Sequence, residues 1–93
     1  MALIATVTKK SVTATMDKMW TITMNMILTD NTVEVINKDY PVNYRSGDSI
    51  PAKTAKFIEL MQEDIDNYKS EQQLFNAAAL NTAVTNVQAG LVV

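Results

Sequence analysis

The sequence predicts an α+β fold: an antiparallel β-meander of three or four strands over residues 2–44, followed by helical residues 50–89 packed on one face as one long or two shorter helices. Three observations predict it. Apolar and polar residues alternate in the first half, turn-forming residues cluster at 45–49, and apolar residues then recur every three or four positions. Because 93 residues leave room for one compact unit, we expect residues 1–93 to form a single domain.

The first two strands are expected to form a hairpin. The clearest strand has an unbroken row of apolar residues at even positions: Trp20, Ile22, Met24, Met26 and Leu28. In the strand before it, the apolar residues change from odd positions up to Val7 to even positions from Val12. This change of phase predicts a bulge or a short break at residues 9–11. A three-residue loop, 16–18, would place Ala14 opposite Trp20 and Val12 opposite Ile22.

A third strand is expected at residues 33–44. Asp30 and Asn31 both tolerate a positive φ, so we expect a two-residue turn there, which would place Leu28 opposite Val33. Pro41 cannot donate a hydrogen bond to a neighbouring strand. We therefore interpret residues 33–44 as an edge strand with an irregularity at residues 37–39.

The helical region is expected to begin after Ser49, an N-cap residue, with Pro51 in the first turn. Ser70 followed by Gln73 is a weak capping box, which leaves two alternatives open. Either the chain breaks near Ser70 into a helical hairpin, or one helix continues and its second half finds a partner. Gly90 is expected to end the helix in a left-handed conformation. The residues expected in the core are Val12, Trp20, Ile22, Met24, Met26, Leu28, Val42, Phe57, Ile58, Met61, Ile65 and Tyr68.

The composition argues against most catalytic chemistry. The chain has no Cys and no His, which removes thiolate nucleophiles, the usual general base near neutral pH and the commonest metal ligand. A net charge of −2 offers no broad basic surface for nucleic acid. We therefore expect no enzymatic activity, no catalytic residue, no cofactor, no metal, no small-molecule substrate and no nucleic-acid partner.

Two charged clusters have a second interpretation. The carboxylates of Glu59, Glu63, Asp64 and Asp66 could bind a hard cation, but a solvated helix face paired with nearby lysines is favoured. Lys9 and Lys10, beside aromatic residues such as Trp20, could bind a single-stranded nucleic acid. We favour the alternative, in which these lysines mark a bulge and protect the strand edge.

Residues 72–93 are the most informative segment, because 22 consecutive positions carry no charge. They also contain too many Gln, Asn and Thr residues for a transmembrane span. Such depletion of charge is typical of contact surfaces. The spacing predicts a protein interface made of Leu80, Ala83, Val84, Val87 and Leu91. Intramolecular burial of this helix is the alternative.

The whole chain resembles small proteins encoded in the structural-gene regions of tailed bacteriophages. The runs that carry the resemblance are IATVTKKSVT, MWTITMNMILTD, EVINKDYPVNYRSGD and KTAKFIELMQEDIDNYKSEQ, with the uncharged tail. The resemblance implies a structural or assembly protein of the virion that contacts itself or other virion proteins. The alternative is a small phage-encoded inhibitor or adaptor that binds a host protein as a soluble monomer. No signal peptide is recognisable, so we expect the virion or the host cytoplasm.

Overall fold

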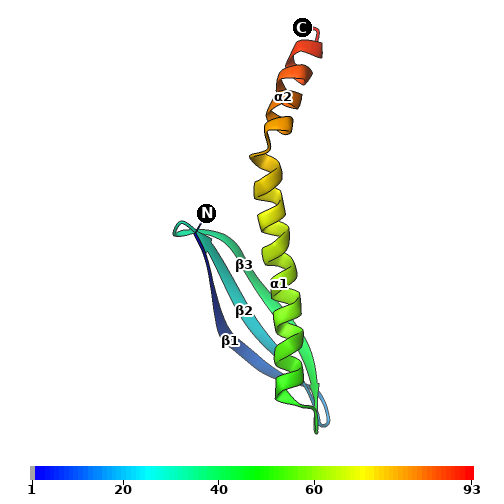
Figure 1. Ribbon diagram of the computed structural model, residues 1–93. Coiled ribbons are helices and arrows are strands. Elements are labelled where there is room, and N and C mark those ends of the chain that lie inside the picture. Colours follow the sequence, from blue (N-terminus) through cyan, green and yellow to red (C-terminus); the bar gives the residue numbers. More distant parts are fainter. Residues whose placement is uncertain (1) are drawn as a thin grey trace. The chain divides into compact units, whose positions relative to one another are not determined.

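The computed structural model describes residues 2–93 and contains, within that range, three strands followed by two helices (Figure 1). Strands β1 (Leu3–Met16), β2 (Met19–Asp30) and β3 (Val33–Arg45) form one antiparallel sheet in the order β1-β2-β3. They are followed by α1 (Ile50–Phe75) and α2 (Ala78–Gly90). The predicted α+β class and its β-meander are confirmed.

The contacts group the chain into two compact units. The first extends to Glu63 and contains the sheet with the first half of α1. The second, Asp64–Val93, contains the rest of α1 and all of α2. The single domain expected from chain length stays a prediction.

The register of the first hairpin agrees with the sequence pattern. Ala14 pairs with Trp20 and Val12 with Ile22, as predicted. The register shifts between Lys9 and Ser11, which confirms the predicted bulge. The connection is tighter than expected, because the strands extend to Met16 and Met19. Lys18 adopts a φ of 57°, and a second shift after Ala14 takes up the extra residue.

The second hairpin corrects the predicted register. Its turn is formed by Asn31 and Thr32, one residue later than expected, and both have a positive φ, 50° and 71°. Leu28 therefore pairs with Ile36 rather than Val33, after a register shift between Leu28 and Thr29. The irregularity lies there and not at residues 37–39. Two consecutive residues with positive φ match the right-handed twist of the flanking strands, which explains why the turn tolerates a threonine.

A short turn joins β3 to α1. The backbone N–H of Arg45 donates to Oδ2 of Asp48 at 2.8 Å, and the N–H of Asp48 donates to the carbonyl of Arg45 at 2.9 Å. Gly47 supplies the positive φ, 93°, that such a turn needs. The hydroxyl of Ser49 accepts the N–H of Ala52 at 3.4 Å, which confirms the predicted N-cap.

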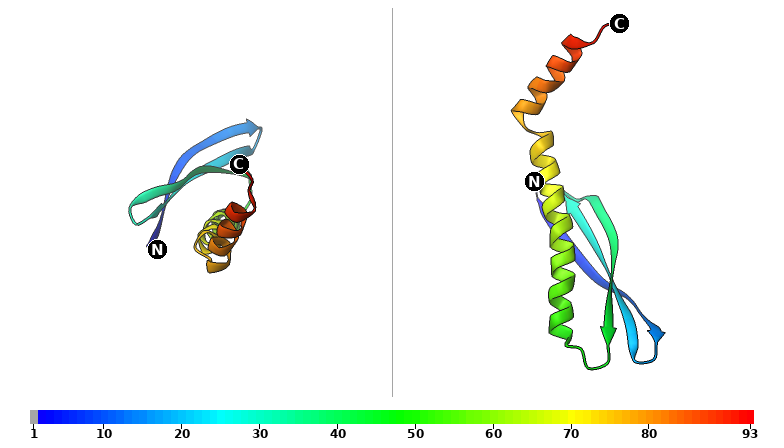
Figure 2. Two further views of the ribbon diagram at one scale, coloured as in Figure 1. Left: turned by 90° about the horizontal axis from the view of Figure 1, so that it is seen from above. Right: turned by 90° about the vertical axis from the view of Figure 1, so that its right-hand side faces the viewer.

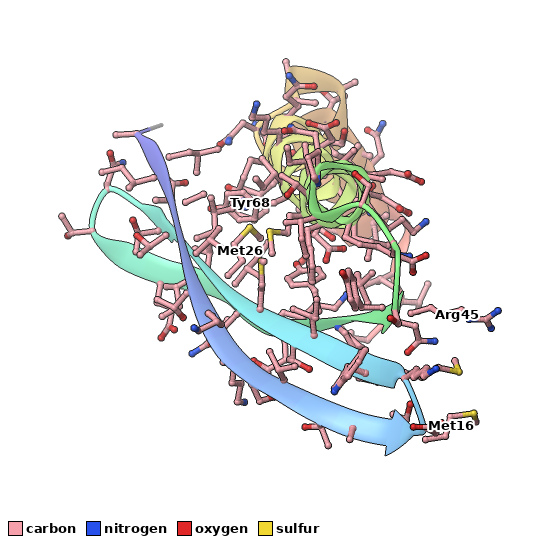
Figure 3. All side chains as sticks on the ribbon, turned by 90° about the horizontal axis from the view of Figure 1, so that it is seen from below. Met16, Met26, Arg45 and Tyr68 are labelled. Carbon is pink, nitrogen blue, oxygen red and sulfur yellow. The ribbon has the colours of Figure 1, made fainter. Side chains whose placement is uncertain are left out.

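The core of the first unit lies between α1 and the part of the sheet formed by β2 and β3. Its buried side chains are Met26, Leu28, Tyr40, Val42, Phe57 and Met61. Figure 2 shows the first half of α1 on the concave side of the sheet, with β1 at the edge away from the helix. In Figure 3, Met26 points from β2 towards α1, whereas Met16 points outwards at the hairpin tip.

The predicted core is partly wrong at its borders. Val12 is 57% exposed, because α1 lies over β2 and β3 and leaves β1 open from Ile4 to Met16. Ile58, on α1, is 58% exposed. Tyr40, which the prediction omitted, is buried. Its partner in the sheet is Met24, so the observed register places it on the face that α1 covers.

In the second unit, α1 continues through Ser70 as far as Phe75, so of the two alternatives left open the break near Ser70 is wrong. The chain leaves helical geometry at Asn76 and Ala77, and Figure 1 shows α2 continuing after a bend rather than folding back as a hairpin. Asn76 stops α1 locally, since its side-chain amide donates to the carbonyl of Gln72 at 2.8 Å. Gly90 is the last residue of α2, but the predicted left-handed conformation there is wrong, because among residues 2–93 the glycine with positive φ is Gly47.

Candidate assembly surface

The five residues predicted to form an interface lie together on α2 and its C-cap. Together with Gln88 they line a shallow hollow of about 260 Å³. We call this surface the α2 stripe, defined by Leu80, Ala83, Val84, Val87 and Leu91. Gln88 was missed by the sequence analysis, although it follows Val84 by one helical turn and could have been found from that spacing.

The α2 stripe is open to solvent. None of the residues Ala78–Gly90 is buried, and Val84, Val87 and Leu91 are each more than 60% exposed. No charged residue occurs anywhere between Gln72 and Val93, so neither side of α2 carries the groups that usually keep a helix soluble. The role of the stripe as a protein interface stays a prediction.

A second apolar surface lies in the first unit. Val12, Trp20, Ile22, Tyr44 and Ile50 line a hollow of about 260 Å³ between β1, the central strand and the start of α1. We call it the sheet hollow. The rings of Trp20 and Tyr44 lie 6.0 Å apart at a tilt of 48°, and Val12 and Ile50 are more than half exposed. It exists because α1 does not cover β1, and the sequence analysis had assigned Val12, Trp20 and Ile22 to the core.

A third hollow, of about 320 Å³, is polar. Its lining includes Arg45, Asp48 and Lys53 at the turn between β3 and α1. The carboxylate of Asp48 has partners within this hollow. Nζ of Lys53 lies 3.3 Å from its Oδ2, which also accepts the backbone N–H of Arg45. The hydrogen bond from Arg45 lowers the pKa of Asp48, so the group stays a carboxylate that holds the turn together. The arrangement stabilises a turn rather than poising an acid or a base.

Each of the two charged clusters contains an ion pair. Lys56 lies 3.5 Å from Glu59 on the exposed side of α1, as a solvated helix face requires. Across residues 2–93, no group of three or more carboxylates converges on a possible metal position. Lys10 occupies the bulge in β1 and pairs with Asp39. Within the same residues, no helix carries an apolar run sufficient to cross a membrane.

Comparison of the chain with protein families, with curated protein sequences and with solved structures finds no match. Arguments about function therefore rest on the surfaces themselves.

Proposed function

We propose that the chain is a non-enzymatic structural or assembly subunit that associates through the α2 stripe. One observation carries the proposal: a helix without a single charge exposes Leu80, Val84, Val87 and Leu91 to solvent. Small hydrophobic residues scattered over a surface need no explanation, but a continuous row of them on an uncharged helix is typical of a contact surface.

The energetics support an intermolecular role. Covering the stripe would remove several hundred Å² of apolar surface from water, worth several kcal/mol at about 25 cal/mol per Å² before association costs are subtracted. The chain has few buried side chains and no disulfide, so its folded state is stabilised by a small core alone. Apolar surface buried on association would add a large share to that stability. The resemblance to small proteins of phage structural-gene regions supports a place in a virion or its assembly, where contacts with copies of itself or with other virion proteins are the function.

Sedimentation velocity of the full chain tests the proposal. The wild type should form oligomers whose population rises with concentration, and Val84→Glu should sediment as a monomer because an unpaired carboxylate in a covered stripe is costly. Thr82→Glu is the matched control: it adds the same charge two residues away, on the opposite side of α2, and should leave association unchanged. Circular dichroism should show the strand signal intact in both variants.

A wild type that is monomeric throughout the accessible concentration range would contradict the proposal and favour the alternative, an adaptor or inhibitor that binds another protein as a monomer. Loss of the folded state in Val84→Glu of a monomeric protein would show that the stripe is intramolecular core. The place in a virion has its own test: mass spectrometry should detect the chain in purified particles of a phage that encodes it.

A further inference from the structure

We infer that the α2 stripe of one copy docks in the sheet hollow of a second copy. This inference rests on the proposed function and names the surface that the stripe recognises. Both surfaces are exposed apolar hollows, one in each compact unit. Pairing them covers both with one contact, whereas pairing two α2 stripes would leave the sheet hollow open to water.

The two surfaces match in chemistry. The residues that line the sheet hollow, like those of the stripe, include no charged side chain. Val7 lies on the same face of β1, opposite Met26, and is 48% exposed, but Lys9, opposite Met24, lies between Val7 and Val12, so the uncharged surface of the hollow ends at Val12. A charged helix would lose the hydration of its charges on this surface, whereas the α2 stripe has none to lose.

Helix lengths argue that the stripe comes from a second copy. Ile50 is the first residue of α1, and the 26 residues of that helix span about 39 Å before the chain reaches α2. Even if α2 turned straight back, its own length of about 20 Å plus about 10 Å for residues 91–93 would end short of Ile50. A second copy has no such limit.

A contact of this kind either closes reciprocally between two copies, each stripe in the other copy's hollow, or continues through further copies as a ring or filament. Each contact buries several hundred Å² per partner, below the roughly 800 Å² per partner of a stable isolated pair.

Cysteine cross-linking tests the inference cleanly because the chain has no cysteine of its own. Val12→Cys in the sheet hollow and Val84→Cys in the stripe are made in separate full-length chains, one of them isotope-labelled, then mixed and mildly oxidised. We expect a mixed Val12→Cys to Val84→Cys disulfide, identified by mass spectrometry. The controls are Thr13→Cys, which pairs with Thr21 on the other face of the sheet, and Thr82→Cys on the far side of α2. Mixtures that contain a control should yield several-fold less mixed product.

The outcomes separate this inference from the proposed function. A Val84→Cys homodimer without mixed product would overturn docking in the sheet hollow while leaving self-association through the stripe intact. Absence of every cross-link, with monomeric sedimentation, would overturn both. A double variant with both cysteines in one chain, oxidised at high dilution, should not close on itself. Formation of an internal disulfide there would show that the stripe reaches its own sheet hollow, and would overturn the inference.

Discussion

Lys10 and Asp39 form an ion pair across the full width of the sheet, from β1 to β3, over the central strand. Lys10 is the residue at which the β1 register shifts, and the bulge turns its side chain towards the outer face. Asn25 of β2 lies between the two and donates to Oδ1 of Asp39 at 3.0 Å and to the Asn37 side chain at 2.8 Å. A polar network thus connects all three strands on the face that α1 leaves open.

This network predicts a pH dependence. Hydrogen bonds from Lys10 and Asn25 lower the pKa of Asp39, so its contribution to stability is present above the ordinary Asp pKa and is lost as pH falls through the lowered value. In Lys10→Met, the pKa of Asp39 should rise towards its ordinary value, as followed by NMR titration of the carboxyl carbon. Lys9→Met is the control, since Lys9 pairs with Met24 on the opposite face. Equal titration midpoints in the wild type and Lys10→Met would contradict the role of the pair.

The core assignment predicts very different costs for two methionines on strands. Met26 is 1% exposed, and Met26→Ala should destabilise the chain by about 2–5 kcal/mol, the usual cost of emptying such a buried position. Met16 is 64% exposed, and Met16→Ala should change stability by less than about 0.5 kcal/mol. Urea unfolding followed by the fluorescence of Trp20 measures both. Similar losses in the two variants would show that the helix does not cover β2 as described.

The second hairpin turn predicts a stabilising substitution. Thr32 is β-branched and holds a φ of 71°, which costs an L-residue with a branched side chain more than it costs glycine. Thr32→Gly creates the Asn-Gly pair preferred in two-residue hairpins and should raise the free energy of unfolding by about 0.5–1 kcal/mol. The same substitution at Thr13, inside β1, should lower it. Thermal unfolding of the two variants distinguishes this from a general effect of glycine.

The start of α2 predicts a second stabilising substitution. Ala77 occupies the N-cap position with φ −68° and ψ 131°, and no side chain caps the helix. Ala77→Asp supplies an acceptor for the first free N–H groups and should stabilise α2 by about 1 kcal/mol. The gain should appear as slower amide hydrogen exchange in residues 78–90. Ala77→Val, which offers no acceptor, should give no protection, and equal protection in both variants would rule out capping as the cause.

Local patterns in the sequence were sufficient for the features that depend on neighbours in the chain. The change of apolar phase between Val7 and Val12 predicted the bulge at Lys10, and Ser49 predicted the start of α1. The spacing of residues 80–91 predicted that the members of the α2 stripe share one face, and in the structure they all line one hollow. In each case the period of a strand or helix determines which side chains share a face, and that period can be recognised in the sequence.

Only the tertiary structure decided how far each face is covered. Alternation places Val12 and Met26 on the same side of the sheet, yet Met26 is buried and Val12 exposed, because α1 lies over β2 and β3 and leaves β1 open. The register at Tyr40 likewise depends on a turn at Thr32 that residue preference disfavours. Both outcomes are set by contacts between residues distant in the chain, where the total packing energy outweighs the preference of any single residue. The sheet hollow follows from this packing, since it is the part of the apolar face that one helix is too narrow to cover.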